Sequence, residues 1–400
     1  MFRQLPPTAS PLIASDLARG LAGGSLRDGA TGRFSRSLAE TLGVPACHLA
    51  SSGRTALYLL LRALAHEPSL AGRREIVLPA YTCPAVAKVA LDVGLRPRLV
   101  DVSPATLGFD LDRLTDAIGR QTLVVMHVHP FGLPQPVDLV LDLAHQAGAV
   151  VIEDAAQSMG ARSAGRPVGV RGDFGLYSLG PGKPMSLGGG GVLSVNGSRY
   201  GAIVAEAWKT LPDVGAVGSA LAEARLAAFA LAFHPRGWWL ITRTGLNSVG
   251  DREESWRYRL MGLAPSQAAV GLALLPKLDE ANQLRRRNAE RLLARLAGLD
   301  GVCLPMVDPS TEPIFLRLPV LVPDEARHNE VFRRLWAAGI GVGRMYQRPL
   351  GAIFPQIPSD GNRGAELVAR SLLTLPTHHY LTAADVERIV DTFRVVVGSA

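Results

Sequence analysis

The sequence predicts an α/β fold built on a mainly parallel β-sheet, and three observations support this prediction. Between about residues 45 and 195, short apolar runs alternate with helical patterns across short connections, which is typical of parallel α/β domains. The run Ala149-Val150-Val151-Ile152 is apolar throughout, as expected for a strand that is covered by helices on both faces. The chain has 400 residues, more than one hydrophobic core usually serves, so two domains are expected.

The elements of the first domain follow from this alternation. Each expected strand is a short apolar run, and helical patterns fill the intervals between strands. The strands are expected at residues 75–79, 96–102, 122–127, 149–153, 174–178 and 191–195. The helices are expected near residues 55–65, 84–93, 110–119 and 137–148.

Residues 200–256 interrupt the alternation and are expected to form a helical insertion. Within it, residues 216–233 are rich in Ala, Leu and Phe, and only Glu223 and Arg225 are charged. We expect a helix buried against the body of the protein or against a partner subunit. The less favoured alternative is a contact with a membrane surface, because Trp and Arg follow this apolar helix.

The remaining pattern indicates a smaller C-terminal α/β domain. A long helix is expected from Pro265 to about Leu296, and its arginine run at 285–287 is interpreted as a solvated face. A strand near 314–322 and helices near 325–338 and 383–397 follow. The expected division is therefore a large domain over 1–255, which includes the insertion, and a small domain over 256–400.

Composition narrows the class of function. The net charge is +7, but the basic residues are scattered, so no nucleic-acid partner is expected. The three cysteines show no CxxC spacing, which argues against a disulfide framework and a metal site. We expect a cytoplasmic protein, because the N-terminus lacks the apolar core of a signal peptide and no run of eighteen apolar residues occurs.

Lys183 is the most informative single residue. It follows Ser178 by five residues and precedes the four glycines at 188–191, in a segment with few polar side chains. An ammonium group there is poorly solvated, which lowers its pKa. Lysines of this kind act as Schiff-base nucleophiles or general bases.

Two earlier motifs add to this lysine. Ser52, Gly53 and Arg54 open the helix near 55–65, where exposed N–H groups favour an anion, although an ordinary serine N-cap is a competing interpretation. Asp154 ends an apolar strand and suits either the protonated ring nitrogen of a ligand or a structural ion pair. Gln157 lies within reach of the same ligand.

Pyridoxal 5′-phosphate requires three groups together: a phosphate cradle, a carboxylate and an amine. Here the cradle would include the Ser178 hydroxyl, Asp154 would supply the carboxylate and Lys183 the amine. In these motifs the chain resembles the DegT/DnrJ-type sugar aminotransferases, a family of fold-type I pyridoxal-phosphate enzymes, from about residue 33 to 397. The segments that carry the resemblance are 52–57 (SGRTAL), 77–82 (VLPAYT), 129–134 (HPFGLP), 151–157 (VIEDAAQ), 178–183 (SLGPGK), 267–271 (QAAVG) and 375–378 (LPTH).

The resemblance implies a large domain with a mainly parallel seven-stranded sheet and a smaller C-terminal α/β domain. It also implies that Lys183 binds the cofactor as a Schiff base and moves the substrate proton. Asp154 would keep the pyridinium protonated, and Gln157 would lie near the ring. Ser178 would hold the phosphate together with the backbone at Gly53 and Arg54. The family further implies a homodimer in which the partner subunit completes each site.

The chain departs from the family pattern at several positions. Arg54 replaces the usual threonine, and Gly189 replaces a glutamate. Cys83 replaces the aromatic residue that stacks on the cofactor ring, so the stacking is expected to pass to Tyr81 or to be weaker. The Asn-x-Arg segment is not recognisable at 259–262, which leaves open whether the partner subunit completes the phosphate site.

Three residues are expected near the substrate. Tyr346 and Arg348 lie in a C-terminal loop that approaches the substrate in the family. His129 follows a strand, but a structural role in its turn is a competing interpretation.

The expected activity is transfer of an amino group from an amino acid, glutamate by resemblance, to a keto sugar. The resemblance points to a nucleotide-linked sugar in glycan, polysaccharide or secondary-metabolite biosynthesis. Two alternatives remain open. One is another pyridoxal-phosphate reaction on a sugar, such as dehydration, for which the family replaces the lysine with histidine. The other is a catalytically silent relative with a regulatory or scaffold role.

Overall fold

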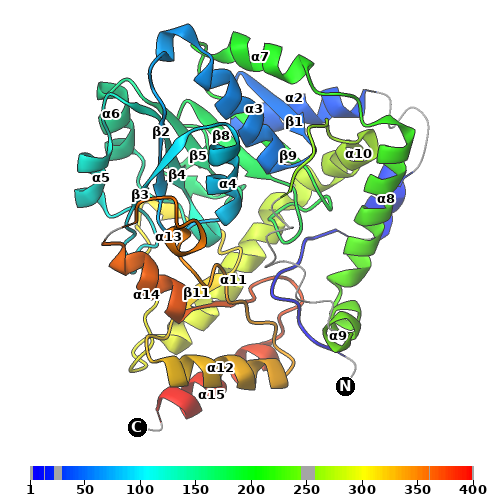
Figure 1. Ribbon diagram of the computed structural model, residues 1–400. Coiled ribbons are helices and arrows are strands. Elements are labelled where there is room, and N and C mark those ends of the chain that lie inside the picture. Colours follow the sequence, from blue (N-terminus) through cyan, green and yellow to red (C-terminus); the bar gives the residue numbers. More distant parts are fainter. Residues whose placement is uncertain (1–2, 13, 22–28, 245–256, 360, 399–400) are drawn as a thin grey trace.

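A seven-stranded sheet forms the centre of the computed structural model, which describes residues 3–12, 14–21, 29–244, 257–359 and 361–398 (Figure 1). Its strand order is β1-β9-β8-β5-β4-β2-β3. Within this sheet β9 runs opposite to the other six strands, which are parallel to one another, so the expected mainly parallel sheet is confirmed. The strands are β1 (Ala46–Ala50), β2 (Glu75–Pro79), β3 (Arg96–Val100), β4 (Thr122–Val128), β5 (Val150–Asp154), β8 (Phe174–Ser178) and β9 (Gly191–Val195).

Helices cover both faces of this sheet, which explains why its central strands are continuously apolar. Val77, Val125 and Val151 pack on one face against α5 (Leu111–Ala117) and α6 (Asp138–Gln146). Alternate residues, such as Ile76 and Ile152, pack on the other face because side chains alternate along a strand. That face is covered by α3 (Gly53–Ala65), α4 (Pro84–Asp92) and α7 (Gly201–Lys209). The helix α2 (Ala30–Leu42) packs with α10 (Pro265–Leu274) beside β1.

The prediction of a single long helix from Pro265 to Leu296 is wrong. The structure contains α10 and α11 (Leu278–Leu296), joined by a 3₁₀ turn over Leu275–Lys277. Pro276 lies in this turn, and proline cannot donate the backbone hydrogen bond that a continuous α-helix requires.

The prediction that the arginines at 285–287 form a solvated face is also wrong for Arg285. This side chain is 2% exposed, whereas Arg286 is half-buried and Arg287 is exposed. Successive helical residues point about 100° apart, so three consecutive arginines cannot share one solvated face.

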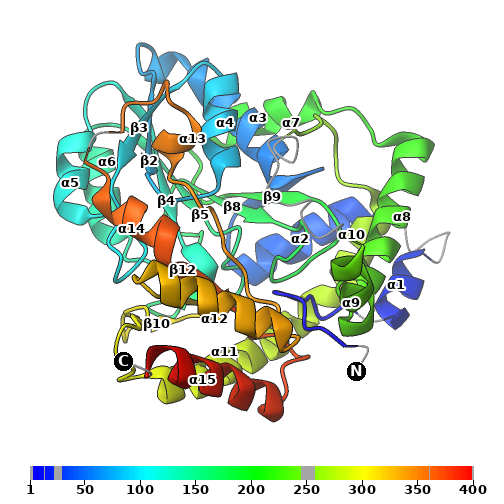
Figure 2. The ribbon, with the colours of Figure 1, turned by 60° about the horizontal axis from the view of Figure 1, so that its bottom comes forward.

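The insertion forms α7, α8 (Gly215–Ala232) and α9 (Pro235–Arg243). The expected helix over 216–233 is confirmed, but its burial against the body is wrong. Only Leu226 and Phe229 of α8 are buried, and the helix stands at the edge of the molecule beside α10 and α1 (Ala14–Leu21) (Figures 1 and 2). By length and composition alone α8 could cross a membrane. Residues 245–256, and with them the expected boundary at 255/256, lie outside the described residues, so the domain division stays a prediction.

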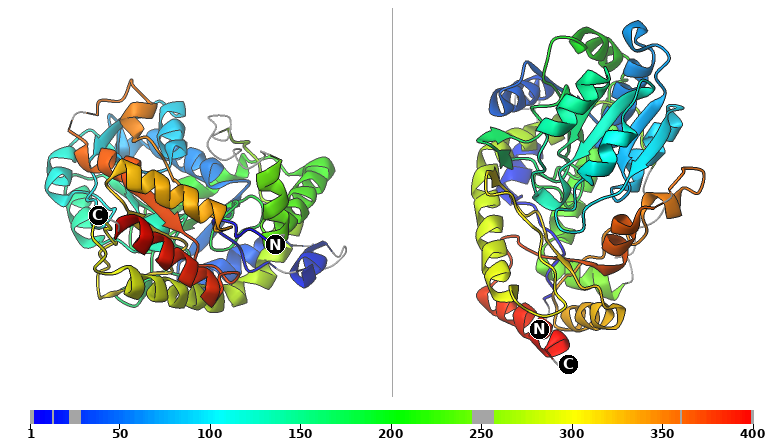
Figure 3. Two further views of the ribbon diagram at one scale, coloured as in Figure 1. Left: turned by 90° about the horizontal axis from the view of Figure 1, so that it is seen from below. Right: turned by 90° about the vertical axis from the view of Figure 1, so that its left-hand side faces the viewer.

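The C-terminal elements pack around a two-stranded antiparallel sheet of β11 (Leu318–Leu321) and β12 (Leu372–Leu375). The strand expected at 314–322 therefore starts later than predicted. The helices of this part are α12 (Glu325–Ala337), α14 (Arg363–Ser371) and α15 (Ala383–Val397), and the right-hand view of Figure 3 shows them below the large sheet. The short helix α13 (Leu350–Ile353) instead packs against α4. A small three-stranded sheet joins β10 (Thr311–Glu312), β6 (Arg162–Ser163) and β7 (Arg166–Pro167).

The N-terminal segment, residues 3–10, threads between the C-terminal elements and α9 (Figure 2). The Arg3 guanidinium donates to both carboxylate oxygens of Asp385 at 3.0 and 2.8 Å. The Leu5 side chain is fully buried, and its N–H donates to Gly339 O at 2.8 Å. This segment is therefore part of the folded core.

Candidate active site

A cavity of about 1020 Å³ opens at the carboxyl edge of the sheet. Val128, Asp154 and Ser178 end the neighbouring strands β4, β5 and β8, and all three line it. Ligands bind at this edge in α/β folds. The volume is at the upper end of the range for small-molecule sites, about 300–1,000 Å³, so it has room for a cofactor together with a substrate.

The N-terminus of α3 forms one wall. Ser52 is its N-cap, and its hydroxyl accepts a hydrogen bond from Thr55 N at 3.1 Å. Gly53 packs against Ser178, since a Cβ at Gly53 would lie 3.6 Å from Ser178 Cβ. A Cβ at Gly191 would lie 2.4 Å from Gly53 N, so glycine is required for this close approach. The first N–H groups of a helix lack intrahelical acceptors, so this wall suits a phosphate.

The glycine run is held beside this wall by hydrogen bonds. Gly190 N donates to Ser51 O at 2.8 Å. The Gln267 side-chain amide donates to Leu187 O at 2.8 Å and to Gly189 O at 3.3 Å. The glutamine of the Gln-Ala-Ala motif therefore shapes the cavity from α10.

Asp154 presents a buried carboxylate to the cavity. Its Oδ1 accepts from Ala156 N at 3.0 Å. Burial raises the pKa of the Asp154 carboxyl, while the Ala156 hydrogen bond and the charge of Lys183 act in the opposite direction. A buried carboxylate is favourable only with a partner, and a protonated ring nitrogen is such a partner.

His129 lines the same cavity, but both of its ring nitrogens are engaged within the protein. Nδ1 accepts from Gln135 N at 3.0 Å, so the proton resides on Nε2, which donates to Glu153 Oε2 at 2.9 Å. This geometry favours the structural interpretation of His129. Burial raises the pKa of Glu153, but hydrogen bonds from His129 and from backbone N–H groups lower it to about 2.

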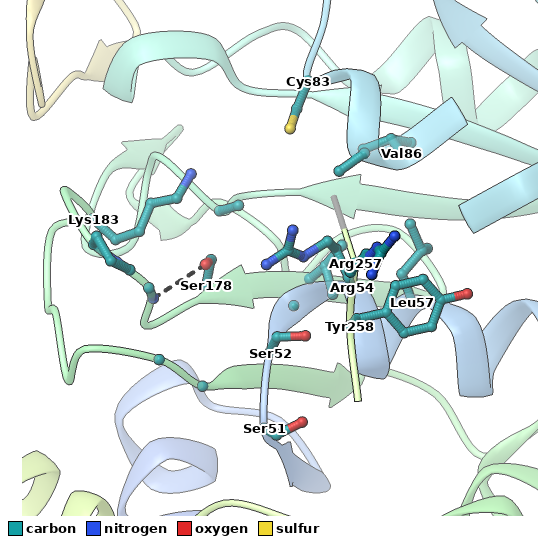
Figure 4. Close-up of a pocket in the computed structure, with 18 of the residues that line it drawn as sticks. Ser51, Ser52, Arg54, Leu57, Cys83, Val86, Ser178, Lys183, Arg257 and Tyr258 are labelled. Carbon is teal, nitrogen blue, oxygen red and sulfur yellow. Dashed lines mark hydrogen bonds between the residues drawn. The ribbon is translucent and has the colours of Figure 1, made fainter. Parts of the chain in front are cut away.

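Lys183 lies in the turn that follows β8, and its side chain extends into the cavity with the Cys83 thiol (Figure 4). Burial lowers the pKa of the Lys183 ammonium. Cys83 and Asp154 oppose this shift, and the charges of Arg317 and Arg54 add to it. The geometry thus favours a larger fraction of neutral amine than an ordinary lysine has.

The loop that carries Tyr346 closes the cavity from the C-terminal part. Gln157 Oε1 accepts from Phe131 N at 3.1 Å, which directs the Gln157 amide toward the Tyr346 hydroxyl at 3.2 Å. Tyr346 has a φ of 47°, a strained conformation for a residue with a bulky side chain. Such strain persists where surrounding contacts enforce it.

Tyr81 is the one proposed site residue that does not line the cavity. Its hydroxyl donates to Met345 O at 2.6 Å, and its ring meets the Tyr346 ring edge-on at a centroid distance of 5.8 Å. Through these two contacts Tyr81 supports the loop that carries Tyr346. The other ten proposed residues line the cavity: Gly53, Arg54, Cys83, His129, Asp154, Gln157, Ser178, Lys183, Tyr346 and Arg348.

Several cationic residues of the cavity wall were missed by the sequence interpretation. Asp154 is the only acidic residue among the described lining residues, against many cations. Arg257 lines the same cavity as Arg54, and both are labelled in Figure 4. The backbone O of Arg259 accepts from Thr55 Oγ1 at 2.8 Å. The sequence signal that could have identified this segment is the alternation of cationic and aromatic side chains at Arg257, Tyr258 and Arg259. The missed cations are Arg225, Arg257, Arg259 and Arg317.

Comparison with known proteins gives consistent matches. The model of the DegT/DnrJ/EryC1/StrS aminotransferase family matches residues 12–233 and 239–394. GDP-perosamine synthase of Caulobacter vibrioides is 29% identical over 364 residues, which cover 89% of this chain and 87% of the relative. The dTDP-3-amino-3,4,6-trideoxy-alpha-D-glucose transaminase of Streptomyces venezuelae is 30% identical and covers 86% and 81%. The structure of S. venezuelae DesV in complex with a ketimine intermediate has a TM-score of 0.75 at 26% identity, covering 96% and 94%.

Proposed function

The chain belongs to the DegT/DnrJ/EryC1/StrS aminotransferase family, and from this membership we propose that its cavity transfers an amino group from an amino acid to a keto sugar. The protein is a pyridoxal-phosphate-dependent aminotransferase. The observation that carries the proposal is the convergence of Lys183, Asp154 and the α3 N-terminus on one cavity.

The residues present fit pyridoxal phosphate. The wall formed by Gly53, Ser178 and the glycine run suits the phosphate, because it offers backbone N–H groups and a hydroxyl and contains no acidic side chain. Asp154 suits the protonated ring nitrogen, and Lys183 suits the aldehyde carbon. When bound, the cofactor supplies an electron sink for the carbon that gains or loses the amino group.

Lys183 is proposed to move the proton. Its Nζ takes a proton from the amino-bearing carbon of the donor and later delivers one to the carbonyl carbon of the acceptor. A lowered pKa supports this role, because a general base works best when its pKa lies near the working pH. Gln157 and Tyr346, joined at 3.2 Å, are proposed to orient the ring and the acceptor, and His129 to hold the underlying turn.

The acceptor is proposed to be a nucleotide-linked keto sugar in glycan, polysaccharide or secondary-metabolite biosynthesis. The names of the relatives refer to GDP- and dTDP-linked sugars. The cavity is lined by three exposed cations, Arg257, Arg259 and Arg348, which match the charge of a diphosphate. Glutamate is proposed as the donor.

The test is a spectral titration. The purified protein is loaded with pyridoxal phosphate, and glutamate is then added while the visible absorption band is followed. We expect the band to form on loading and to bleach as the amino group is taken up. A protein that forms no band would contradict the proposal and favour a catalytically silent relative. The same titration with Lys183→Ala provides the negative control.

We also propose a homodimer whose interface includes the exposed apolar face of α8. Val217 and Leu231 are 76% and 74% exposed, and Leu221 and Arg225 of the same helix line the cavity. Burying this face against a partner would remove apolar surface from water. Sedimentation should give a dimer for the wild type and a shift toward monomer for Leu231→Glu. Val395→Glu, at an exposed position of α15, is the matched control, and a monomeric wild type would contradict the proposal.

A cytoplasmic location is proposed as well. Cys47, Cys83 and Cys303 are all free thiols, which suits a reducing compartment. Membrane association through α8 is the alternative, and it predicts co-sedimentation with anionic vesicles at low salt. Absence of the protein from the vesicle pellet would exclude that alternative.

A further inference from the structure

Arg285 is a buried cation that the proposed chemistry does not use. It projects from α11 and is the largest fully buried side chain of the described residues. None of the described carboxylates forms a salt bridge with it. Burial lowers its pKa to about 10, so it stays charged at neutral pH. A buried charge is costly unless it is hydrogen-bonded, so the acceptors around Arg285 reveal its role.

The acceptors of Arg285 belong to three different segments. Nη2 donates to Ala9 O at 3.0 Å and to Pro184 O at 3.2 Å. Nη1 donates to Asn282 Oδ1 at 2.6 Å. Pro184 directly follows Lys183, so one guanidinium joins α11, the N-terminal segment and the turn that carries the lysine.

Asn282 extends the same network to the loop after Asp154. Its amide donates to Met159 O at 3.1 Å. Gly160 has a φ of +90°, and a Cβ there would lie 2.4 Å from Asn282 Nδ2, so the loop backbone lies directly against this amide. The guanidinium and the amide therefore connect two loops. One follows Asp154 at the end of β5, and the other follows β8 and carries Lys183.

The N-terminal segment holds the other side of the lysine turn. Thr8 Oγ1 donates to Gly182 O at 3.4 Å, and Ser186 N donates to Ser10 Oγ at 3.3 Å. Thr8 and Ala9 are both 1% exposed. The turn at 182–186 has no regular secondary structure, so these contacts supply the order that a helix or strand would otherwise provide.

We propose that Arg285 is a positioning residue for Lys183, and that it acts through Pro184 O and through the N-terminal segment at residues 8–10. This inference rests on the proposed role of Lys183. The planar guanidinium presents several donors in a fixed arrangement, whereas a lysine ammonium is a compact point charge. Arg285→Lys therefore keeps the charge but cannot reproduce all three contacts.

The test compares Arg285→Lys with Arg287→Lys, the same substitution two residues away on an exposed side chain of the same helix. Deuterium exchange is measured for peptides covering residues 179–187, with and without pyridoxal phosphate. The kcat and KM of the donor half-reaction are measured on the loaded protein as the limiting rate at which glutamate bleaches the visible band and the glutamate concentration that gives half of this rate. For Arg285→Lys we expect exchange of the turn to accelerate by about tenfold or more. We expect kcat to fall by about tenfold or more, since a 1 Å misplacement costs about a hundredfold. KM should stay within about threefold, because ground-state binding does not depend on the turn.

Ser10→Ala provides a second, milder variant in case Arg285→Lys folds poorly. It removes only the acceptor of Ser186 N, and we expect changes in the same direction with a smaller size. Arg287→Lys should match the wild type in both measurements.

Two results would overturn the inference. One is that, in Arg285→Lys, the exchange of the turn and kcat both equal those of the wild type. The other is an acceleration of exchange spread evenly over the whole chain, which would mean that Arg285 only stabilises the fold. The two proposals fail separately, because a wild type that forms no visible band contradicts the role of Lys183, whereas the exchange of the turn still reports whether Arg285 orders it.

Discussion

Asp385 allows a stability prediction whose size follows from the structure. Its side chain is fully buried and accepts from Arg3 at 2.8 and 3.0 Å and from Thr382 N at 2.9 Å. Burial raises the pKa of Asp385, but these hydrogen bonds and the Arg3 charge lower it from 3.8 to about 2. A shift of about 2 units at about 1.4 kcal/mol per unit corresponds to about 2–3 kcal/mol of folding free energy.

The sign of this contribution fixes its pH dependence. Because the folded-state pKa lies below the unfolded one, the ionised carboxylate stabilises the fold fully above about pH 4. The contribution is lost as the pH falls from about 4 to about 2. Asp385→Asn keeps the shape but removes the charge, so it should cost about 2 kcal/mol near neutral pH and progressively less below pH 4.

The assay is urea-induced unfolding followed by tryptophan fluorescence at several pH values. Asp391→Asn, at an exposed position of the same helix, is the matched control and should change stability by less than about 0.5 kcal/mol. The reasoning is refuted if Asp385→Asn matches the wild type at pH 7, or if its deficit is the same at pH 3 as at pH 7.

Three further predictions concern the cavity. Lys183→Ala should abolish turnover and the visible band while circular dichroism stays that of the wild type, and a variant that transaminates at the wild-type rate contradicts the assignment. Ser178→Ala should raise the Kd for pyridoxal phosphate by about tenfold, since a hydrogen bond to a charged group contributes about 1.5–3 kcal/mol, and an unchanged Kd in fluorescence titration would remove Ser178 from the phosphate site. Arg317→Met should raise the pKa of the Lys183 amine, because the Arg317 charge lowers it. Lys183 is a free amine only in the complex with substrate, so the acidic limb of the pH profile of kcat should move to higher pH, and movement to lower pH would contradict the direction assigned to the Arg317 charge.

The sequence predicted the sheet well because its signals are local. Six strands were found from apolar runs, but β1, Ala46-Cys47-His48-Leu49-Ala50, lacks the β-branched residues that mark a strand. Asp154, Ser178 and Lys183 were found because parallel strands bring their carboxyl ends to one edge. These positions required no knowledge of distant contacts.

The errors arose where tertiary contacts decide. From the sequence, Arg285 is one of three consecutive arginines predicted to be solvated. Its burial depends on hydrogen bonds to the distant carbonyls of Ala9 and Pro184. The apolar composition of α8 predicted burial against the body or a partner subunit, and the body leaves most of the helix exposed. Arg317 reaches the cavity from the C-terminal part, and no local pattern marks it.

The path of the N-terminal segment has a consequence for the order of folding. The contact between Arg3 and Asp385 spans 382 positions, and His378 also holds Pro6 O at 2.8 Å. During synthesis residues 3–10 leave the ribosome long before these partners, and contacts of such long separation form slowly. The large sheet can assemble earlier, as domains fold in order of synthesis. The contacts that fix residues 3–6 can therefore form only after His378 and Asp385 have been synthesised, and a nascent chain arrested before α15 should lack the Arg3–Asp385 ion pair even though its large sheet is formed.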